Sequence, residues 1–449
     1  MVRGSVITFV FQIISLAVGV VSRSLLARML HPYGMGLFTI FVFIPTLLHA
    51  ASNLGLNYSI VNFIGRKRYN AAAMSGLALG GGLLISIITI AVSAVIYAIV
   101  RYAYMGRDLV ELPNAAIGLA VIVYIPYMLW FCNLFVHLAR NRIVAYNIVW
   151  TIQPVVAFIG YFLTWLLLPK SGDIVAKSAF VYLSYSAGVV ASLIAGLVIL
   201  GREGLLRWTY PKGALKESII FGIKTHIGSF VGFLGLHMSI PFINSFIDTA
   251  SLGIYTTTAL PIGEAFKRIF SSISTAMLPI ASSAEGEKGN TLINVVMRNT
   301  IFICVVTLAA FAVVCRPVIL ILFGKDYAGG VEPTLVILIW IFFTTLGKVF
   351  QSDAVGRGKP LWITYTTILT FVVLFVCSWI MVPRTGLMGA AWASTFSAIA
   401  GYLLWIILYV TRADGFSLVN STFIKSKDFG KIFNKLFKLG RTPIQPPED

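Results

Sequence analysis

The stretch MVPRTGLMGAAWAS, from Met381 to Ser394, places a polar Pro-Arg-Thr-Gly turn between two long apolar runs. A close counterpart, Pro169-Lys170-Ser171-Gly172, lies 214 positions before Pro383-Arg384-Thr385-Gly386. Three short matches at nearly one offset indicate that the chain contains a duplicated unit. The other two matches, both 217 residues apart, are Gly36-Leu37-Phe38 with Gly253-Ile254-Tyr255 and Arg140-Asn141-Arg142 with Arg357-Gly358-Lys359.

The composition is that of an integral membrane protein. Of 449 residues, 58% are hydrophobic and 11% charged, whereas soluble domains have about 45–50% and about 25%. The net charge of +18 does not indicate nucleic-acid binding, because Lys and Arg cluster at the ends of apolar runs and in the C-terminal tail. The four cysteines lie inside apolar runs and are expected to be buried thiols. We expect no metal and no other cofactor.

Apolar runs of about 20 residues can cross a bilayer core of about 30 Å as helices. We therefore predict an all-α membrane protein with twelve transmembrane helices. The predicted spans are 5–27, 36–64, 74–100, 115–138, 146–168, 178–200, 219–243, 252–281, 300–323, 334–350, 361–382 and 389–410.

The basic residues in the connections predict the orientation. The side that carries the N-terminus receives 14 Lys and Arg and the other side 8, before seven more in the tail. This asymmetry places both termini in the cytoplasm. Since each copy of the repeat holds an even number of spans, the halves should be parallel, with a substrate path between them. The predicted parts are a six-helix bundle at 1–200, a basic cytoplasmic linker at 201–218, a second six-helix bundle at 219–410 and a basic tail at 411–449.

The tail is expected to bind anionic membrane lipids. Apolar residues fall on one face of a possible helix in this segment, and lysines occupy much of the rest. Anionic headgroups contribute about 1 kcal/mol for each nearby Lys. The apolar residues are Phe429, Ile432, Phe433, Leu436 and Phe437, and the lysines are Lys427, Lys431, Lys435 and Lys438.

Polar side chains inside the spans concentrate on the first, second, seventh and eighth helices, which are equivalent pairs under the repeat. An ionisable group at mid-membrane costs about 2.5–3.5 kcal/mol on insertion scales, so each is a candidate site residue. For Asn and His, a hydrogen bond between neighbouring helices is an equally simple explanation. The main candidates are Gln12 and Arg23 on the first span, His49, Asn53 and Asn57 on the second, His226 and His237 on the seventh, and Glu264, Lys267 and Arg268 on the eighth.

The charges favour an anionic substrate. Spans one to six contain no Asp or Glu, and Glu264 is the only deep carboxylate predicted in the others. Glu264 and Arg268 can pair at i, i+4, which would leave Lys267 as unpaired positive charge. Lys348, at the end of the tenth span, is explained by snorkelling to the interface. Binding of a phosphorylated group needs Arg and Lys. We expect Lys267, Arg268 and Arg23 to bind phosphate, and His49, Asn53, Asn57, Gln12 and Glu264 to line a polar cavity.

Five segments resemble the polysaccharide flippases of the multidrug/oligosaccharidyl-lipid/polysaccharide (MOP) exporter superfamily, in the family's order. The resemblance implies two bundles around a cavity that alternates between sides of the cell (cytoplasmic) membrane. It also implies transport of an oligosaccharide on a polyprenyl phosphate or pyrophosphate, for cell-surface polysaccharide biosynthesis, beside glycosyltransferases or a polymerase of the same pathway. The segments are LLARMLHPYGMGLF (Leu25–Phe38), SLGIYTTTALPI (Ser251–Ile262), RPVILILFGKDYAG (Arg316–Gly329), GRGKP (Gly356–Pro360) and VPRTGLMGAAWAS.

Three other classes of protein fit less well. A multidrug exporter of the same superfamily would be expected to have a carboxylate in the first bundle. A major-facilitator carrier of a small anionic solute usually has an Asp in the loop after its second helix, whereas this loop reads FIGRKRYN. A membrane-embedded glycosyltransferase usually has a large polar catalytic loop. No catalytic combination of nucleophile and base is found here, so we expect a transporter and no enzyme.

Overall fold

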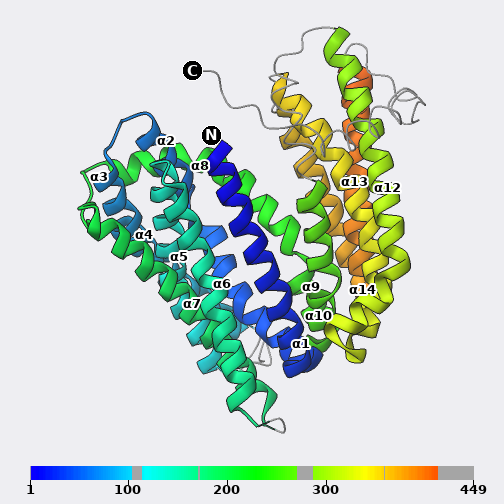
Figure 1. Ribbon diagram of the computed structural model, residues 1–449, viewed down its shortest axis with the longest axis horizontal. Helices are drawn as coiled ribbons and strands as arrows, with labels where there is room; N and C mark the ends of the chain where they lie inside the picture. Colours follow the sequence, from blue (N-terminus) through cyan, green and yellow to red (C-terminus); the bar gives the residue numbers. More distant parts are fainter. Residues whose placement is uncertain are drawn as a thin grey trace. The chain divides into compact units, whose positions relative to one another are not determined.

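The computed structural model describes residues 2–103, 114–169, 172–270, 287–357, 359 and 361–412. Regular structure in these ranges is entirely helical (Figure 1). The elements are α1 (Val2–Ser52), α2 (Leu56–Gly65), α3 (Ala71–Gly76), the π-helix η1 (Leu77–Gly81), α4 (Gly82–Ala103), α5 (Asn114–Ala139), α6 (Ile143–Leu167), α7 (Ile174–Arg202), α8 (Ala214–His237), α9 (Ser239–Phe246), α10 (Thr249–Thr257), α12 (Glu287–Phe323), the 3-10 helix η2 (Lys325–Gly330), α13 (Val331–Gly356) and α14 (Leu361–Arg412), with a further helix at 259–270.

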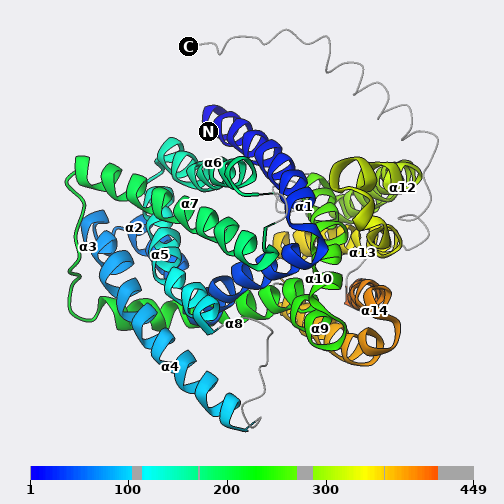
Figure 2. The same cartoon turned by 90° about the horizontal axis from the view of Figure 1, so that it is seen from below.

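Two of these helices are long enough to cross a membrane twice. Among the described residues, nine segments are long and apolar enough to span, and the longest have 43 and 51 residues within α1 and α14. At 1.5 Å per residue they measure roughly 65 Å and 77 Å, against a bilayer core of about 30 Å. Each is interrupted, and Figure 2 shows the chain turning back within α1. The count of twelve spans stays a prediction.

The interruptions follow from the local sequence. In α1, His31 has φ 54° and ψ 178° and precedes Pro32, which disfavours a helical conformation at the residue before it. In α14, Gly386 of the Pro-Arg-Thr-Gly segment has φ 61° and ψ −136°, a conformation open to glycine. A Cβ on Gly389 would lie 2.4 Å from the Met381 carbonyl oxygen, so the turn also requires a small residue there. The turn predicted between spans eleven and twelve is confirmed.

Helix bounds and contacts follow the 217-residue offset of the repeat. Helices α5 and α13 end at Ala139 and Gly356, which are 217 positions apart. A Cβ on Gly36 would meet the Thr249 carbonyl oxygen at 1.9 Å, and one on Gly253 would meet the Pro32 carbonyl oxygen at 1.8 Å. These two contacts join the same pairs of equivalent positions. The hydroxyls of another equivalent pair, Thr39 and Thr256, lie 3.0 Å apart.

The chain forms two compact units, each described by itself. The first comprises 1–258 and 319–330, and the second comprises 259–318 and 331–449. One core cluster of the first unit joins α2 to η1, α4 and α5 through Leu56, Ile60, Leu77, Tyr124 and Met128. In the second unit, α12, α13 and α14 meet around Met297, Phe350 and Tyr409. The predicted bundles, 1–200 and 219–410, follow the repeat and stay a prediction.

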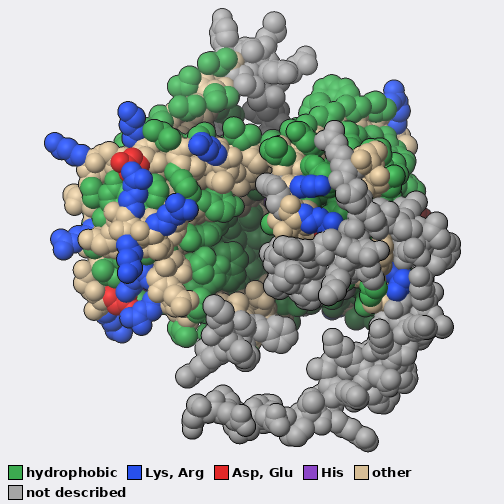
Figure 3. Space-filling model, turned by 90° about the horizontal axis from the view of Figure 1, so that it is seen from above, with side chains coloured by type: hydrophobic (Ala, Val, Ile, Leu, Met, Phe, Trp, Pro, Cys, Tyr) green, Lys and Arg blue, Asp and Glu red, His purple; other side chains and the backbone are tan. Residues whose placement is uncertain are grey.

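The segment between α7 and α8 lies against glycines of α3 and η1. A Cβ on Gly76 would be 2.0 Å from the Thr209 carbonyl oxygen, and one on Gly80 would be 2.2 Å from that of Trp208. Exposed basic residues occur on this segment and directly after α2. Figure 3 shows Lys and Arg side chains gathered on one part of the molecular surface. The cysteines were all expected to be buried, which is confirmed for Cys132, Cys304 and Cys315, whereas Cys377 is half-buried.

Candidate functional site

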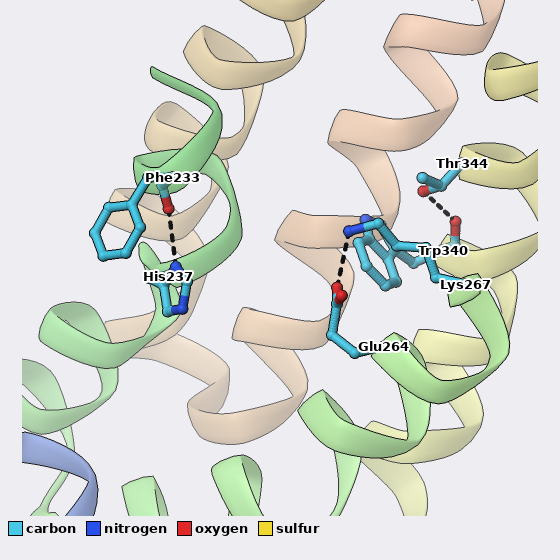
Figure 4. A network of polar contacts seen from close by, with 6 residues as sticks. All are labelled: Phe233, His237, Glu264, Lys267, Trp340 and Thr344. Carbon is cyan, nitrogen blue, oxygen red and sulfur yellow. Dashed lines mark hydrogen bonds and ion pairs between the residues drawn. The ribbon is translucent and has the colours of Figure 1, made fainter. Parts of the chain in front are cut away.

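Glu264 and Lys267 form an ion pair on the helix at 259–270. The Lys267 Nζ donates to Glu264 Oε1 at 2.8 Å (Figure 4). Their side chains are 23% and 24% exposed. The sequence prediction that Lys267 would remain unpaired is therefore wrong, because an i, i+3 spacing also places two side chains on one helix face. Arg268, on the same helix, is exposed.

Trp340 of α13 packs against this helix. A Cβ on Gly263 would lie 2.9 Å from Ile337 Cγ2 and 3.3 Å from Trp340 Cζ3, so the glycine allows close approach. The Lys267 Nζ lies over the Trp340 ring, 5.4 Å from its centroid, within the range of a cation–π interaction (Figure 4). The Trp340 carbonyl oxygen accepts a 2.7 Å hydrogen bond from the Thr344 hydroxyl.

Lys348 lies one turn after Thr344 on α13 and is half-buried. Its ammonium is close enough to Lys267 and Glu264 to interact electrostatically with both. Within the described ranges, no carboxylate forms an ion pair with it. Its position near the end of a predicted span suggested snorkelling, whereas the structure places it near the Glu264–Lys267 pair.

Asp353 is a second buried carboxylate that the sequence analysis missed. The prediction that Glu264 is the only deep carboxylate in the later spans is wrong, because α13 continues past residue 350 to Gly356. Asp353 is 1% exposed. It accepts hydrogen bonds from Arg357 Nε at 2.6 Å and from the Tyr409 hydroxyl at 2.7 Å. Since Arg357 compensates its charge, Asp353 adds no net negative charge to the second unit.

In the first unit, Arg23 and Gln12 differ in their surroundings. The Arg23 Nη1 donates to the carbonyl oxygen of Thr256. Gln12 is exposed on α1. A guanidinium has five N–H donors, so this bond leaves Arg23 with further donors. The expected phosphate ligands therefore occur in both units, and their predicted convergence on one polar volume stays a prediction.

The polar residues of the second predicted span are buried. His49, Asn53 and Asn57 are 7–8% exposed. Asn53 Nδ2 donates to His49 Nε2 at 3.1 Å, and His49 Nδ1 faces Met128 Sδ at 3.3 Å, so a ring protonated on Nδ1 satisfies both contacts. The side-chain oxygens of Asn53 and Asn57 have no hydrogen-bond partner among the described residues. The structure thus brings His49 and Asn53 together.

The comparisons with known proteins agree on the fold. The chain matches the model of the polysaccharide biosynthesis protein family over residues 1–285. A structure of the lipid II flippase MurJ in an inward closed conformation is similar, with TM-score 0.71 and 14% identity over 99% of this chain and 94% of that one. No curated protein sequence matches significantly.

Two other transporters are similar. An inward-facing multidrug resistance transporter of the MATE family has TM-score 0.64 and 14% identity over 88% of this chain and 95% of that one. A MOP-superfamily transporter from Pyrococcus furiosus has TM-score 0.57 and 15% identity over 91% and 94%. With its apolar helices, the chain is a multi-pass membrane protein. It shares its fold with these transporters and belongs to the polysaccharide biosynthesis protein family.

Proposed function

We propose that this protein is a flippase for lipid-linked oligosaccharides. It would carry sugars attached to a polyprenyl phosphate or pyrophosphate from the inner to the outer leaflet of the cytoplasmic membrane, by alternating access. The family's description as polysaccharide biosynthesis proteins and the fold shared with a lipid II flippase support this substrate class. Partner glycosyltransferases or a polymerase would supply or consume the substrate.

The observation that carries the proposal is the pair Lys267 and Arg268 on a helix within an apolar part of the chain, with Glu264 beside them. Basic side chains match phosphate oxygens in charge and hydrogen-bond donors, whereas a carrier of organic cations needs carboxylates that stay uncompensated. Arg23 is proposed to assist in binding phosphate. His49, Asn53, Asn57 and Gln12 are proposed to meet sugar hydroxyls, for which the partnerless oxygens of Asn53 and Asn57 are suitable acceptors.

The test is glycan export in a strain that depends on this protein. Lys267→Gln and Arg268→Gln remove charge and keep similar length, so we expect export to fall sharply for each and to be lost in the double variant. Arg316→Gln, an exposed residue of α12, is the matched control and should export normally. Expression and membrane insertion are measured for all variants.

Normal export by the double variant would contradict the phosphate role. The competing function, multidrug export, is favoured by the MATE-like fold alone. It predicts that deleting the protein sensitises cells to cationic drugs and leaves glycan export intact. That pair of results would overturn the flippase proposal.

A further inference from the structure

One face of α13 carries three residues of complementary chemistry. Trp340, Thr344 and Lys348 are spaced at i, i+4 and i+8, which places them on one side of a helix. All three are half-buried. Trp340 packs against Gly263 and lies beneath the Lys267 ammonium, so this face of α13 lies beside the helix at 259–270 (Figure 4).

The charges on this face are not balanced. Lys267 is neutralised by Glu264 at 2.8 Å. Lys348 interacts electrostatically with both but has no ion pair within the described part of the chain. Eight residues, about 12 Å of helix, separate Lys348 from the end of α13 at Gly356. An uncompensated ammonium in an apolar helix is costly, and such residues mark substrate pathways.

Glu264 makes the two lysines unequal as anion ligands. An anion that approached Lys267 would also approach the Glu264 carboxylate and be repelled by it. Lys348 has three N–H donors on its ammonium and no such carboxylate bound to it. Glu264 also acts on Lys348, but without direct contact, so it repels an anion less at Lys348 than at Lys267.

We propose that Lys348 is the principal ligand of the substrate's anionic group in the second unit, and that Lys267, which is paired with Glu264, is a weaker one. The inference rests on the proposed function, because it identifies the anion as the phosphate or pyrophosphate of a lipid carrier. It changes which lysine is expected to contribute most to anion binding. Lys348, whose position had been explained by snorkelling, contributes more than Lys267.

Measurements of direct ligand binding test the role of Lys348. The full-length protein is placed in phosphatidylcholine nanodiscs, and its affinity is measured for farnesyl diphosphate and for farnesol, which lacks the phosphates. We expect Lys348→Gln to weaken diphosphate binding about tenfold or more, the usual effect of losing a charged hydrogen bond. Farnesol binding should not change. Glu264→Gln should tighten diphosphate binding, because it removes the repelling charge.

Three further variants keep the test decisive. Lys348→Met preserves length and an apolar stem, so misfolding of the Gln variant would not hide the result. Lys348→Arg should retain most of the affinity. Lys325→Gln, an exposed lysine of η2, is the charge-matched control and should bind normally. Wild-type affinity in both neutral Lys348 variants, or an equal loss in the Lys325 variant, would overturn the inference.

Glycan export separates this inference from the proposed function. If export requires the protein but Lys348→Gln binds diphosphate and exports normally, only the Lys348 assignment is wrong. If Lys348 governs diphosphate binding but export does not require the protein, the flippase proposal is wrong and the anion site stands.

Discussion

The two units differ in how deeply they bury their ion pairs. The first unit buries neutral groups, such as the hydrogen-bonded His49 and Asn53, and also Asn133 and Ser192, whose side-chain polar atoms have no partner among the described residues. Its ion pair of Arg140 with Glu203 is half-buried, as is Glu264 with Lys267 in the second unit, whereas the second unit also pairs the fully buried Asp353 with Arg357. Neutral groups can be replaced by apolar ones at small cost, whereas removing one member of a buried ion pair leaves a charge behind.

The largest effect is expected for Asp353→Ala in the second unit. The change removes the carboxylate that accepts from Arg357 and Tyr409, and breaking a buried pair costs about 3–5 kcal/mol. The apparent melting temperature in detergent measures it. Asp248→Ala is the control, since Asp248 is an exposed N-cap of α10 whose loss costs about 1 kcal/mol. Equal effects of the two substitutions would contradict the importance of ion pairs in this unit.

The first unit should depend more on close approach of its backbone. Gly36→Ala would place a Cβ 1.9 Å from the Thr249 carbonyl oxygen, which no rotamer change can relieve. We expect destabilisation of about 1–3 kcal/mol, as for other overpacked sites. Gly19→Ala is the control, because nothing lies within 4 Å of its added Cβ. There, replacing a helical glycine should be neutral or stabilise by up to about 1 kcal/mol. A tolerated Gly36→Ala would show that α1 and α10 can separate.

Much of the fold could be predicted from the sequence, because an apolar run of sufficient length predicts a membrane-spanning helix. The turn at Gly386 follows from Pro-Arg-Thr-Gly, and the 217-residue offset of the short motifs reappears in the C-terminal ends of α5 and α13. The helix end at Thr257 was not predicted, since the apolar run of the eighth predicted span continues through it.

The site could be predicted only in part, because side-chain pairing depends on rotamers and neighbouring helices. The sequence allows Glu264 to pair with a residue three or four positions later, and only the structure shows Lys267 as a partner. Asp353 looked like a loop residue, because a polar segment follows residue 350. Its burial comes from Tyr409 and Arg357, and Tyr409 is distant in sequence. The predicted tail helix lies outside the described residues.

A smaller effect is expected for Ser192→Ala in the first unit. Ser192 is fully buried, and its hydroxyl has no partner among the described residues, so its removal should be neutral or slightly stabilising. Ser178→Ala, at an equally buried site of α7, removes a hydroxyl that donates to the Gly34 and Ile174 carbonyl oxygens. It should cost about 1 kcal/mol. If Ser192→Ala is the more harmful of the two, an unseen partner such as an ordered water bonds to Ser192.

The smallest effect concerns Glu203, which forms a half-buried ion pair with Arg140 in the first unit. Arg140 donates a hydrogen bond to Glu203 and, with Arg142 3.4 Å away, lowers the pKa of this carboxyl below its usual value. Because the folded pKa is lower than the unfolded one, the stabilisation is complete above about pH 4.3 and is lost as the pH falls through the folded pKa. Because both side chains still contact solvent, this stabilisation should not exceed about 1 kcal/mol. Melting temperatures of wild type and Glu203→Gln should therefore differ near neutral pH and converge in acid. A difference in melting temperature that persists at low pH would mean that Glu203 stabilises the first unit through packing and not through its charge.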